Sequence, residues 1–146
     1  MDFITSNNLQ LTTSVTNDEI EIEINDGGTD KLDDLDSSIS LTRVHDQGQL
    51  WSIMIYVNEQ SRGQRVSSLL LYHLMKEFEM KAREQDIPMS LIRIGIDTDA
   101  SEGYWKHLGF KTGRYSIDGD RYNSRMADGM EAEITAQQLY NFAMNL

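Results

Sequence analysis

The stretch LWSIMIYVNEQSRGQRVSSLLLYHLMKEFEMKARE (50–84) joins a nearly continuous apolar run to a long amphipathic segment. The apolar run at 50–57 predicts a strand covered on both faces, because a half-exposed strand would alternate polar and apolar residues. From Val66 onward, apolar residues recur every three or four positions, which predicts a helix with one buried face. That apolar stripe consists of Val66, Leu70, Leu71, Leu74, Met75 and Phe78. The charged residues expected to face outward are Lys76, Glu77, Glu79, Lys81, Arg83 and Glu84.

A further strand, SLIRIGI (90–96), follows this helix. Pro88 separates the two, and a proline just beyond a helix is a stop signal. A strand, a helix and a second strand in succession imply a parallel pair joined by a right-handed crossover. The segment 50–96 therefore predicts the parallel core of a mixed sheet.

Three segments before this core also have the pattern of strands: LQLTTSV (9–15), EIEIEI (19–24) and SISLTRV (38–44). The second alternates strictly, which predicts one packed isoleucine face and one hydrated glutamate face. Short connections let such strands form an antiparallel meander. Residues 27–37 form a polar, acidic connection within it.

The C-terminal part predicts smaller elements. Residues 99–108 have the pattern of a short helix that Gly109 ends, residues 111–117 that of a strand, and a last strand falls within 122–134. Thr135-Ala-Gln-Gln138 is a capping-box pattern before a final helix at 136–145. That helix offers apolar residues to its own core or to a second copy: Leu139, Tyr140, Phe142 and Ala143. The expected fold is a single mixed α/β (α+β) domain over residues 1–146.

Composition excludes several classes of function. The chain has 146 residues, no cysteine and three histidines, so thiolate metal sites and a catalytic thiol are excluded and no metal site is expected. The N-terminus lacks the pattern of a signal peptide, and no apolar run reaches membrane-spanning length. We therefore expect a cytoplasmic or other intracellular protein without a membrane partner. The net charge of −11 opposes nucleic-acid binding and favours cationic partners. Residues 1–49 contribute 11 acidic and 2 basic residues to that balance.

The strand-to-helix junction at 57–68 is a candidate anion site. Unpaired backbone N–H groups at a helix N-terminus attract anions, and Gly63 allows a close approach to the backbone. Arg62 and Arg65 add positive charge in an otherwise acidic chain. The pattern suggests a phosphate-bearing ligand, while the alternative is an ordinary loop with surface arginines.

A second motif, Gly103-Tyr104-Trp105-Lys106-His107-Leu108-Gly109-Phe110, follows one helix and one strand later. Together the two motifs resemble the acetyl-CoA core of the GNAT acetyltransferase superfamily, over residues 50–112. The nearest resemblance is to the histone-acetylating branch, through Asn58-Glu59-Gln60 and the Gly-Tyr-Trp-Lys-His run at 103–107. The sequence departs from the superfamily at Arg65, where a glycine is usual, and at Ser67, where glycine or alanine is usual. The helical pair that normally follows the first strand is replaced by the acidic residues 27–37.

The resemblance implies acetyl-CoA as co-substrate and transfer of its acetyl group to a primary amine. The residues it implies for acetyl-CoA binding are Ile55, Tyr56, Val57, Arg62, Gly63, Gln64, Arg65, Val66, Ser67, Ser68, Thr98, Ser101, Trp105 and Lys106. A backbone N–H on the strand at 50–57 would stabilise the thioester oxyanion.

The acid and the base are less directly implied. The superfamily's usual tyrosine acid falls on Trp105, so the adjacent Tyr104 is the candidate. The histone branch's glutamate base falls on Gln49. Asp97, at the carboxyl end of its strand, is the candidate base. Other carboxylates and imidazoles nearby in sequence are His45, Asp46 and Asp99.

Two functions remain open from the sequence. One is an N-acetyltransferase acting on a cationic amine, such as a polyamine, an aminoglycoside or a lysine-bearing peptide, which Glu19, Glu21 and Glu23 would attract. The other is a non-catalytic acidic module that binds CoA or a basic protein. A homodimer is compatible with both.

Overall fold

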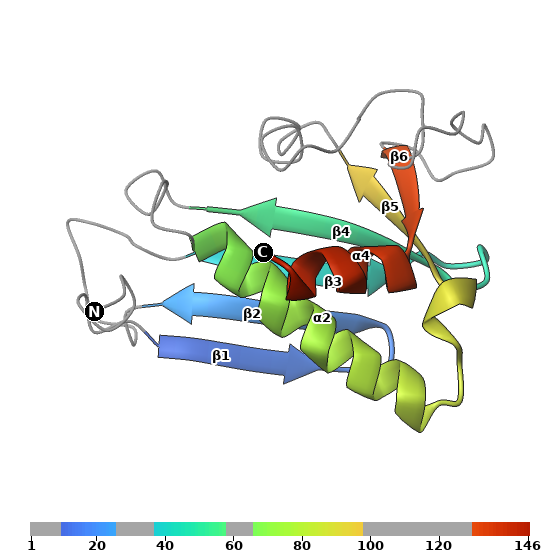
Figure 1. Ribbon diagram of the computed structural model, residues 1–146, viewed down its shortest axis with the longest axis horizontal. Coiled ribbons are helices and arrows are strands. Elements are labelled where there is room, and N and C mark those ends of the chain that lie inside the picture. Colours follow the sequence, from blue (N-terminus) through green and yellow to red (C-terminus); the bar gives the residue numbers. More distant parts are fainter. Residues whose placement is uncertain (1–9, 26–36, 58–65, 98–129) are drawn as a thin grey trace.

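The computed structural model describes residues 10–25, 37–57, 66–97 and 130–146. Through these residues runs a six-stranded sheet with the strands in sequence order (Figure 1). The strands are β1 (Gln10–Val15), β2 (Glu19–Asn25), β3 (Ser37–Arg43), β4 (Leu50–Tyr56), β5 (Arg93–Asp97) and β6 (Met130–Thr135). β4 and β5 pair in parallel, and every other neighbouring pair is antiparallel. The meander, the parallel pair and the α+β class predicted from the sequence are confirmed.

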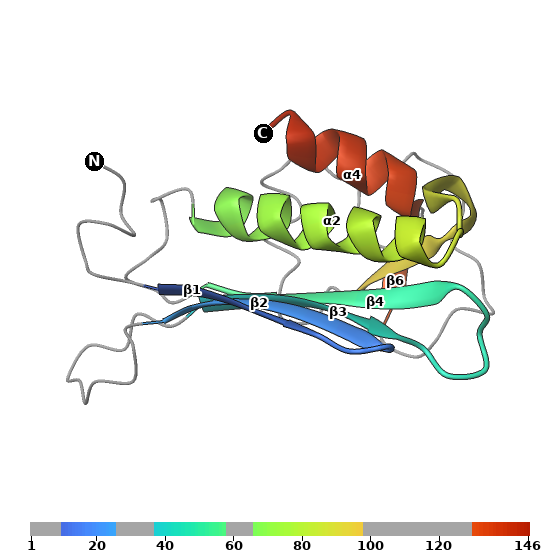
Figure 2. The ribbon, with the colours of Figure 1, turned by 90° about the horizontal axis from the view of Figure 1, so that it is seen from below.

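In the described part of the chain, two helices lie on one face of this sheet (Figure 2). Helix α2 (Val66–Glu84) connects β4 to β5, and α4 (Ala136–Met144) follows β6. Beneath them lie the buried isoleucines of β2 and the apolar residues of β3 to β5. The rings of Trp51 and Phe78 meet edge to face at 5.0 Å and fix α2 to β4. We call the helix-covered side the inner face.

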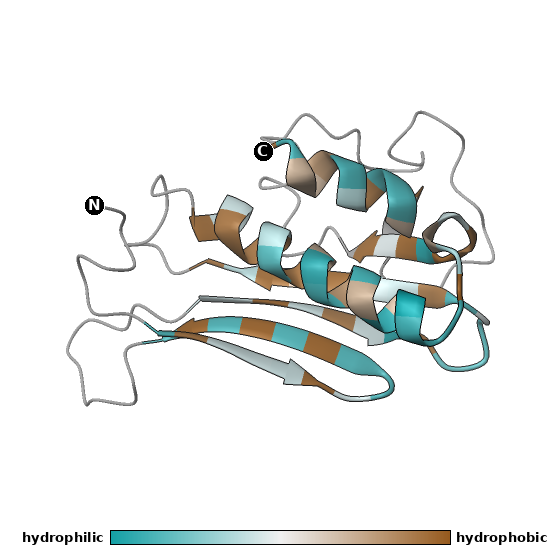
Figure 3. Cartoon of the chain, turned by 60° about the horizontal axis from the view of Figure 1, so that its bottom comes forward, coloured by the Kyte–Doolittle hydropathy of each residue, from teal (hydrophilic) through white to brown (hydrophobic). Residues whose placement is uncertain are grey.

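The opposite side, the outer face, carries the polar half of the alternating strands. Ile20, Ile22 and Ile24 are fully buried, while the glutamates between them point to the outer face. The colours of β2 in Figure 3 show this alternation directly. A period of two on a strand separates residues by face, so the sequence pattern sets the orientation of β2.

The final helix begins as the sequence predicts. Thr135 Oγ1 accepts a hydrogen bond from the Gln138 N–H at 3.1 Å, and Gln138 Oε1 accepts one from the Thr135 N–H at 3.0 Å. This capping box satisfies donors at the start of α4. Leu139 and Ala143 are buried in the core of this chain. These two residues therefore pack within the chain and not against a second copy.

Three predicted details are wrong, and the first is a strand boundary. The strand expected at 90–96 begins at Arg93, because Met89–Leu91 form a short 3₁₀-helix after Pro88. The Leu91 N–H donates to the Pro88 carbonyl at 3.0 Å, which closes this turn.

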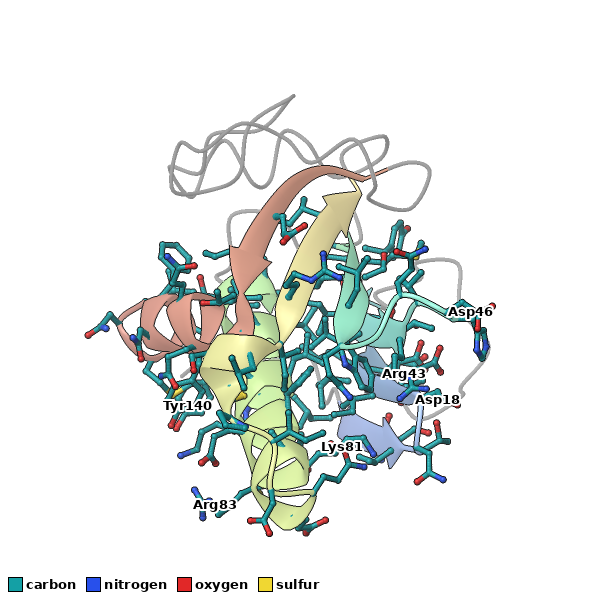
Figure 4. All side chains as sticks on the ribbon, turned by 90° about the vertical axis from the view of Figure 1, so that its right-hand side faces the viewer. Asp18, Arg43, Asp46, Lys81, Arg83 and Tyr140 are labelled. Atoms are coloured by element: carbon teal, nitrogen blue, oxygen red, sulfur yellow. The ribbon has the colours of Figure 1, made fainter. Side chains whose placement is uncertain are left out.

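The strand at 50–57 is not covered on both faces along its length. Met54 and Tyr56 are 59% and 56% exposed on the outer face. Lys81 does not face outward either, being 9% exposed. It lies three residues after Phe78, which places it on the buried stripe of α2, and Figure 4 shows it on the side of the helix that faces the sheet. Its methylene stem can pack there while the ammonium group reaches water.

Several predicted features lie outside the described residues. They are the acidic connection expected at 27–37, except for Ser37, the short helix at 99–108, and the strand at 111–117. The last strand, expected within 122–134, is β6.

Candidate functional site

Strands β4 and β5 separate toward their carboxyl ends. Their pairing runs from Leu50 opposite Arg93 to Ile53 opposite Ile96, while β4 continues to Tyr56. The two arrowheads accordingly point apart in Figure 1. We call this region, from Ile53 and Ile96 onward, the β4–β5 divergence. Within the described residues, the edge of β4 beyond Ile53 has no paired strand on this side, although β4 lies in the middle of the sheet.

The hydrogen bonds of β4 show which backbone groups face this opening. The Val44 N–H donates to the Leu50 carbonyl at 2.9 Å, so Leu50 directs its backbone groups toward β3. The Arg93 N–H donates to the Gln49 carbonyl at 2.8 Å. The odd-numbered residues along β4 therefore direct their backbone N–H and carbonyl groups toward β5. Because this direction alternates along a strand, the amide of Ile55 faces the β5 side. In the described part of the chain, β5 has no residue paired with Ile55.

An amide in this position can bind a ligand in two ways. It can pair with an extended amide-containing chain, as in strand addition to an exposed edge. It can also donate to an oxygen that gains negative charge during a reaction. The side chain of Ile55 packs against the core on the inner face, which holds the amide in place.

The first turn of α2 lies at the same end of the sheet as the divergence (Figures 1 and 2). Val66 is buried there, and Ser67 and Ser68 are partly exposed. This turn contains no acidic residue. The start of α2 therefore keeps the partial positive charge that favours an anion.

The structure brings together the described members of the predicted site. Ile55 and Tyr56 end β4, and Val57 follows them. Val66, Ser67 and Ser68 begin α2, and Asp97 ends β5 beside the divergence. The remaining predicted residues lie outside the described residues: Arg62, Gly63, Gln64, Arg65, Thr98, Ser101, Tyr104, Trp105 and Lys106.

Glu133 is a candidate that the sequence analysis missed. It lies on β6, opposite Gly95 of β5, and Gly95 lies opposite Ser52 of β4. The next pair of β4 and β5, Ile53 and Ile96, is the last before these two strands separate. Its Oε2 atom is buried without a hydrogen-bond partner, and the nearest cation is Arg93 Nη1 at 3.8 Å. Burial raises the pKa of Glu133 above its ordinary value, and the charge of Arg93 offsets this only in part. A partly buried carboxyl group with a raised pKa is a candidate for proton transfer.

One sequence signal could have located the strand of Glu133. The run EAEIT (131–135) alternates acidic and apolar residues as residues 19–24 do. The alternation predicts the strand and the shared face, but the burial of Glu133 depends on neighbours from β5 that the local pattern does not reveal.

The described residues contain no group of histidines and carboxylates that could hold a metal ion. No described helix is both long and apolar enough to cross a membrane.

Comparison with known proteins identifies the fold. No protein-family model matches the sequence, and no curated protein resembles it at a significant level. Among solved structures, a protein from Exiguobacterium sp. 255-15 assigned as an acetyltransferase superposes with a TM-score of 0.53 at 12% identity, over 86% of this chain and 68% of that one. The chain therefore shares its α+β fold with this structure, and this is the GNAT-like fold expected from the sequence.

Two further structures are more distant. A cAMP-binding acyltransferase from Mycobacterium smegmatis gives a TM-score of 0.47 at 11% identity, over 87% of this chain and 38% of that one. A chimera of the spermidine N-acetyltransferase SpeG from Vibrio cholerae and hSSAT gives 0.45 at 12% identity, over 86% of this chain and 71% of that one.

Proposed function

We propose that this chain is an acetyl-CoA-dependent N-acetyltransferase that acts on a cationic primary amine. The observation that carries the proposal is the Ile55 amide, which faces the opening between β4 and β5 in a GNAT-like fold. The proposal treats residues 1–146 as one domain. The resemblance of residues 58–60 and 103–107 to the histone-acetylating branch favours a lysine amine as the acceptor.

The residues at the divergence fit acetyl-CoA. Its pantetheine arm carries amides, which the open edge of β4 at Ile55 and Val57 can pair with. Its pyrophosphate suits the acid-free first turn of α2 with Ser67, together with Arg62 and Arg65 from the preceding segment. Acetyl-CoA, when bound, supplies an activated thioester.

The chain's own residues would then perform three tasks. The Ile55 N–H donates to the thioester oxygen as it becomes negative. Glu133 accepts the proton that the ammonium group must lose, since an alkylammonium has a pKa of about 10.4 and only the neutral amine attacks. Tyr104 donates a proton to the departing thiolate. The new C–N bond replaces the C–S bond. The nitrogen loses two protons in all: one goes to the carboxylate of Glu133 before attack, and the second, lost after attack, replaces the proton that Tyr104 gives to sulfur.

Asp97 is the alternative proton acceptor. It ends β5 beside the divergence, where open α/β sheets commonly bind ligands. Glu133 is favoured because burial already raises the pKa of its carboxyl group, which brings it closer to the working pH of a general base.

A non-catalytic module that binds CoA or a basic protein is the second candidate function. It is favoured by Trp105 and Gln49, which stand where the resemblance expects the acid and the base. In its CoA-binding form, this module shares the acetyl-CoA site with the first candidate and differs from it only in turnover.

Calorimetric titration of acetyl-CoA, followed by an assay of thiol release with spermidine and with a lysine peptide, tests both candidates. The double variant Arg62→Ala, Arg65→Ala should abolish binding. The double variant Lys76→Ala, Arg83→Ala removes the same charge from exposed positions elsewhere on α2 and should bind normally. Binding without turnover would support the non-catalytic module in its CoA-binding form. No binding by the natural sequence would contradict acetyl transfer and CoA binding, and would favour the module that binds a basic protein.

A further inference from the structure

The outer face of the sheet carries side chains that the proposed reaction does not use. They come from three adjacent strands and share one face by register. We call them the outer strip: Glu19, Glu21 and Glu23 of β2, Ser38, Ser40 and Thr42 of β3, and Met54 and Tyr56 of β4. In the described part of the chain, both helices lie on the opposite, inner face (Figure 2).

One side of the outer strip is negatively charged. Alternate residues of a strand are about 6.8 Å apart, so the three glutamates form an evenly spaced row. Glu19 Oε2 accepts from Thr42 Oγ1 at 3.2 Å, and Glu23 Oε1 accepts from Asn25 Nδ2 at 2.9 Å. These donors are neutral. Within the described ranges, none of the three glutamates forms an ion pair with lysine or arginine, so the row keeps its charge.

The nearest ion pair lies beyond the end of this row. Arg43 Nε and Asp18 Oδ1 are 3.5 Å apart, and Figure 4 shows the two side chains together at the end of the sheet where β2 begins. Arg43 is not one of the alternate β3 residues that belong to the outer strip; it lies opposite Trp51. It therefore does not neutralise the outer strip.

The other side of the outer strip is apolar and exposed. Met54 and Tyr56 expose more than half of their surface, and they lie opposite Ser40 and Ser38. The short β3 side chains thus separate the glutamates from the apolar pair. Two strand spacings make this in-plane separation about 10 Å, with β3 running between the two sides.

We propose that the outer strip binds an extended, lysine-rich segment of a partner protein, lying along β3. Lysines at alternate positions of such a segment repeat every ~6.8 Å and match the glutamate row. Met54 would contact lysine methylene stems, and the Tyr56 ring would contact an ammonium group. The match of spacing as well as sign favours an extended peptide over a diffuse attraction to basic proteins.

This surface is independent of acetyl transfer but lies beside its proposed site. Tyr56 ends β4, at the divergence, and is also the last residue of the strip. If the proposed function holds, a segment bound here passes the acetyl-transfer site. If it does not, the surface still recruits a basic partner.

The test uses a fluorescent synthetic peptide with lysine and threonine in alternation, titrated into the full chain at about 50 mM and 300 mM NaCl. A peptide of the same composition with its lysines in one block is the comparison ligand. The charge variant is Glu19→Gln, Glu21→Gln, Glu23→Gln. Its matched control, Glu77→Gln, Glu84→Gln, Asp86→Asn, removes the same charge from the α2 region, away from the strip. Ser40→Trp blocks the strip without changing its charge.

The expected result is tighter binding of the alternating peptide, weakened about tenfold by the strip variant. Ser40→Trp should weaken binding similarly, and the matched control by less than about twofold. Equal losses in the strip variant and its control, equal binding of both peptides, or full competition by spermidine would each overturn the proposal. Acetyl-CoA titrations of the same variants should remain unchanged, so that a failure of this surface is distinguished from a failure of the proposed function.

Discussion

Arg93 Nη1 and Glu133 Oε2 lie 3.8 Å apart across the β5–β6 pair, too far for a direct hydrogen bond. The second terminal nitrogen of Arg93 donates instead to the Gln47 carbonyl at 3.1 Å, in the turn between β3 and β4. The guanidinium group is thus shared between a turn and a carboxylate. Glu133 retains a buried oxygen without a hydrogen bond, which explains why burial outweighs the attraction of Arg93 and raises its pKa.

The first prediction concerns the role of Glu133 in catalysis. Glu133→Gln should lower kcat/KM about 10²- to 10⁴-fold, because the amide cannot accept the ammonium proton. The acidic limb of the pH–rate profile should disappear with it, and Glu133→Asp should restore part of the rate. Unchanged rates and an unchanged profile would exclude Glu133, and Asp97→Asn would then be the variant to measure.

The same substitution should increase stability at neutral and higher pH. A carboxyl group with a raised pKa in the folded state loses stability as pH rises through that pKa, since its charged form is favoured in the unfolded chain. Glu133→Gln removes this penalty. Urea unfolding at about pH 8 should show the variant to be more stable than the natural sequence.

The stability difference should be pH-dependent. It should shrink toward about pH 3, well below the ordinary glutamate pKa of 4.5, where the carboxyl group is almost entirely neutral in both the folded and the unfolded chain. A stability gain with a loss of activity is the combination expected of a functional group held in an unfavourable environment. A constant difference at both pH values would instead indicate a packing effect.

The third prediction tests the Ile55 amide. Ile55→Pro removes one N–H that faces the divergence and leaves the β3-facing hydrogen bonds of Met54 and Tyr56 available. Acetyl transfer should fall about 10²-fold or more, as for other oxyanion donors. Ile55→Val keeps the amide and should retain near-normal rates. Circular dichroism must show that both variants are folded, and equal activity in the two would remove the amide from the mechanism.

The fold could be predicted from the sequence wherever apolar residues recur at a regular spacing along a strand or helix. The Ile–Glu alternation of β2 oriented one strand, and the stripe from Val66 to Phe78 located α2. Prediction failed where the outcome depended on a neighbouring element. Met54 and Tyr56 are apolar but exposed, and Lys81 is charged but buried, because their surroundings come from residues distant in sequence.

The candidate site divides in the same way. The end of β4 and the start of α2 were predicted from a motif, because backbone groups at a strand-to-helix junction follow from local order. Glu133 was not predicted, since its environment is created by Gly95 and Arg93 on another strand. A single sequence shows where carboxylates occur but does not show which of them folding will desolvate.

The fourth prediction concerns the contact that fixes α2 to the sheet. Phe78 is 1% exposed and meets the ring of Trp51 edge to face, so Phe78→Ala leaves a cavity between α2 and β4. The free energy of unfolding should fall by about 3–5 kcal/mol, from lost burial and from the cavity. Leu91→Ala, at a residue 68% exposed, is the control and should change it by less than about 0.5 kcal/mol. Equal effects in urea unfolding would mean that α2 is not held through this contact. In that case the other buried residues of α2, such as Val66, Leu70 and Leu74, would hold the helix against the sheet.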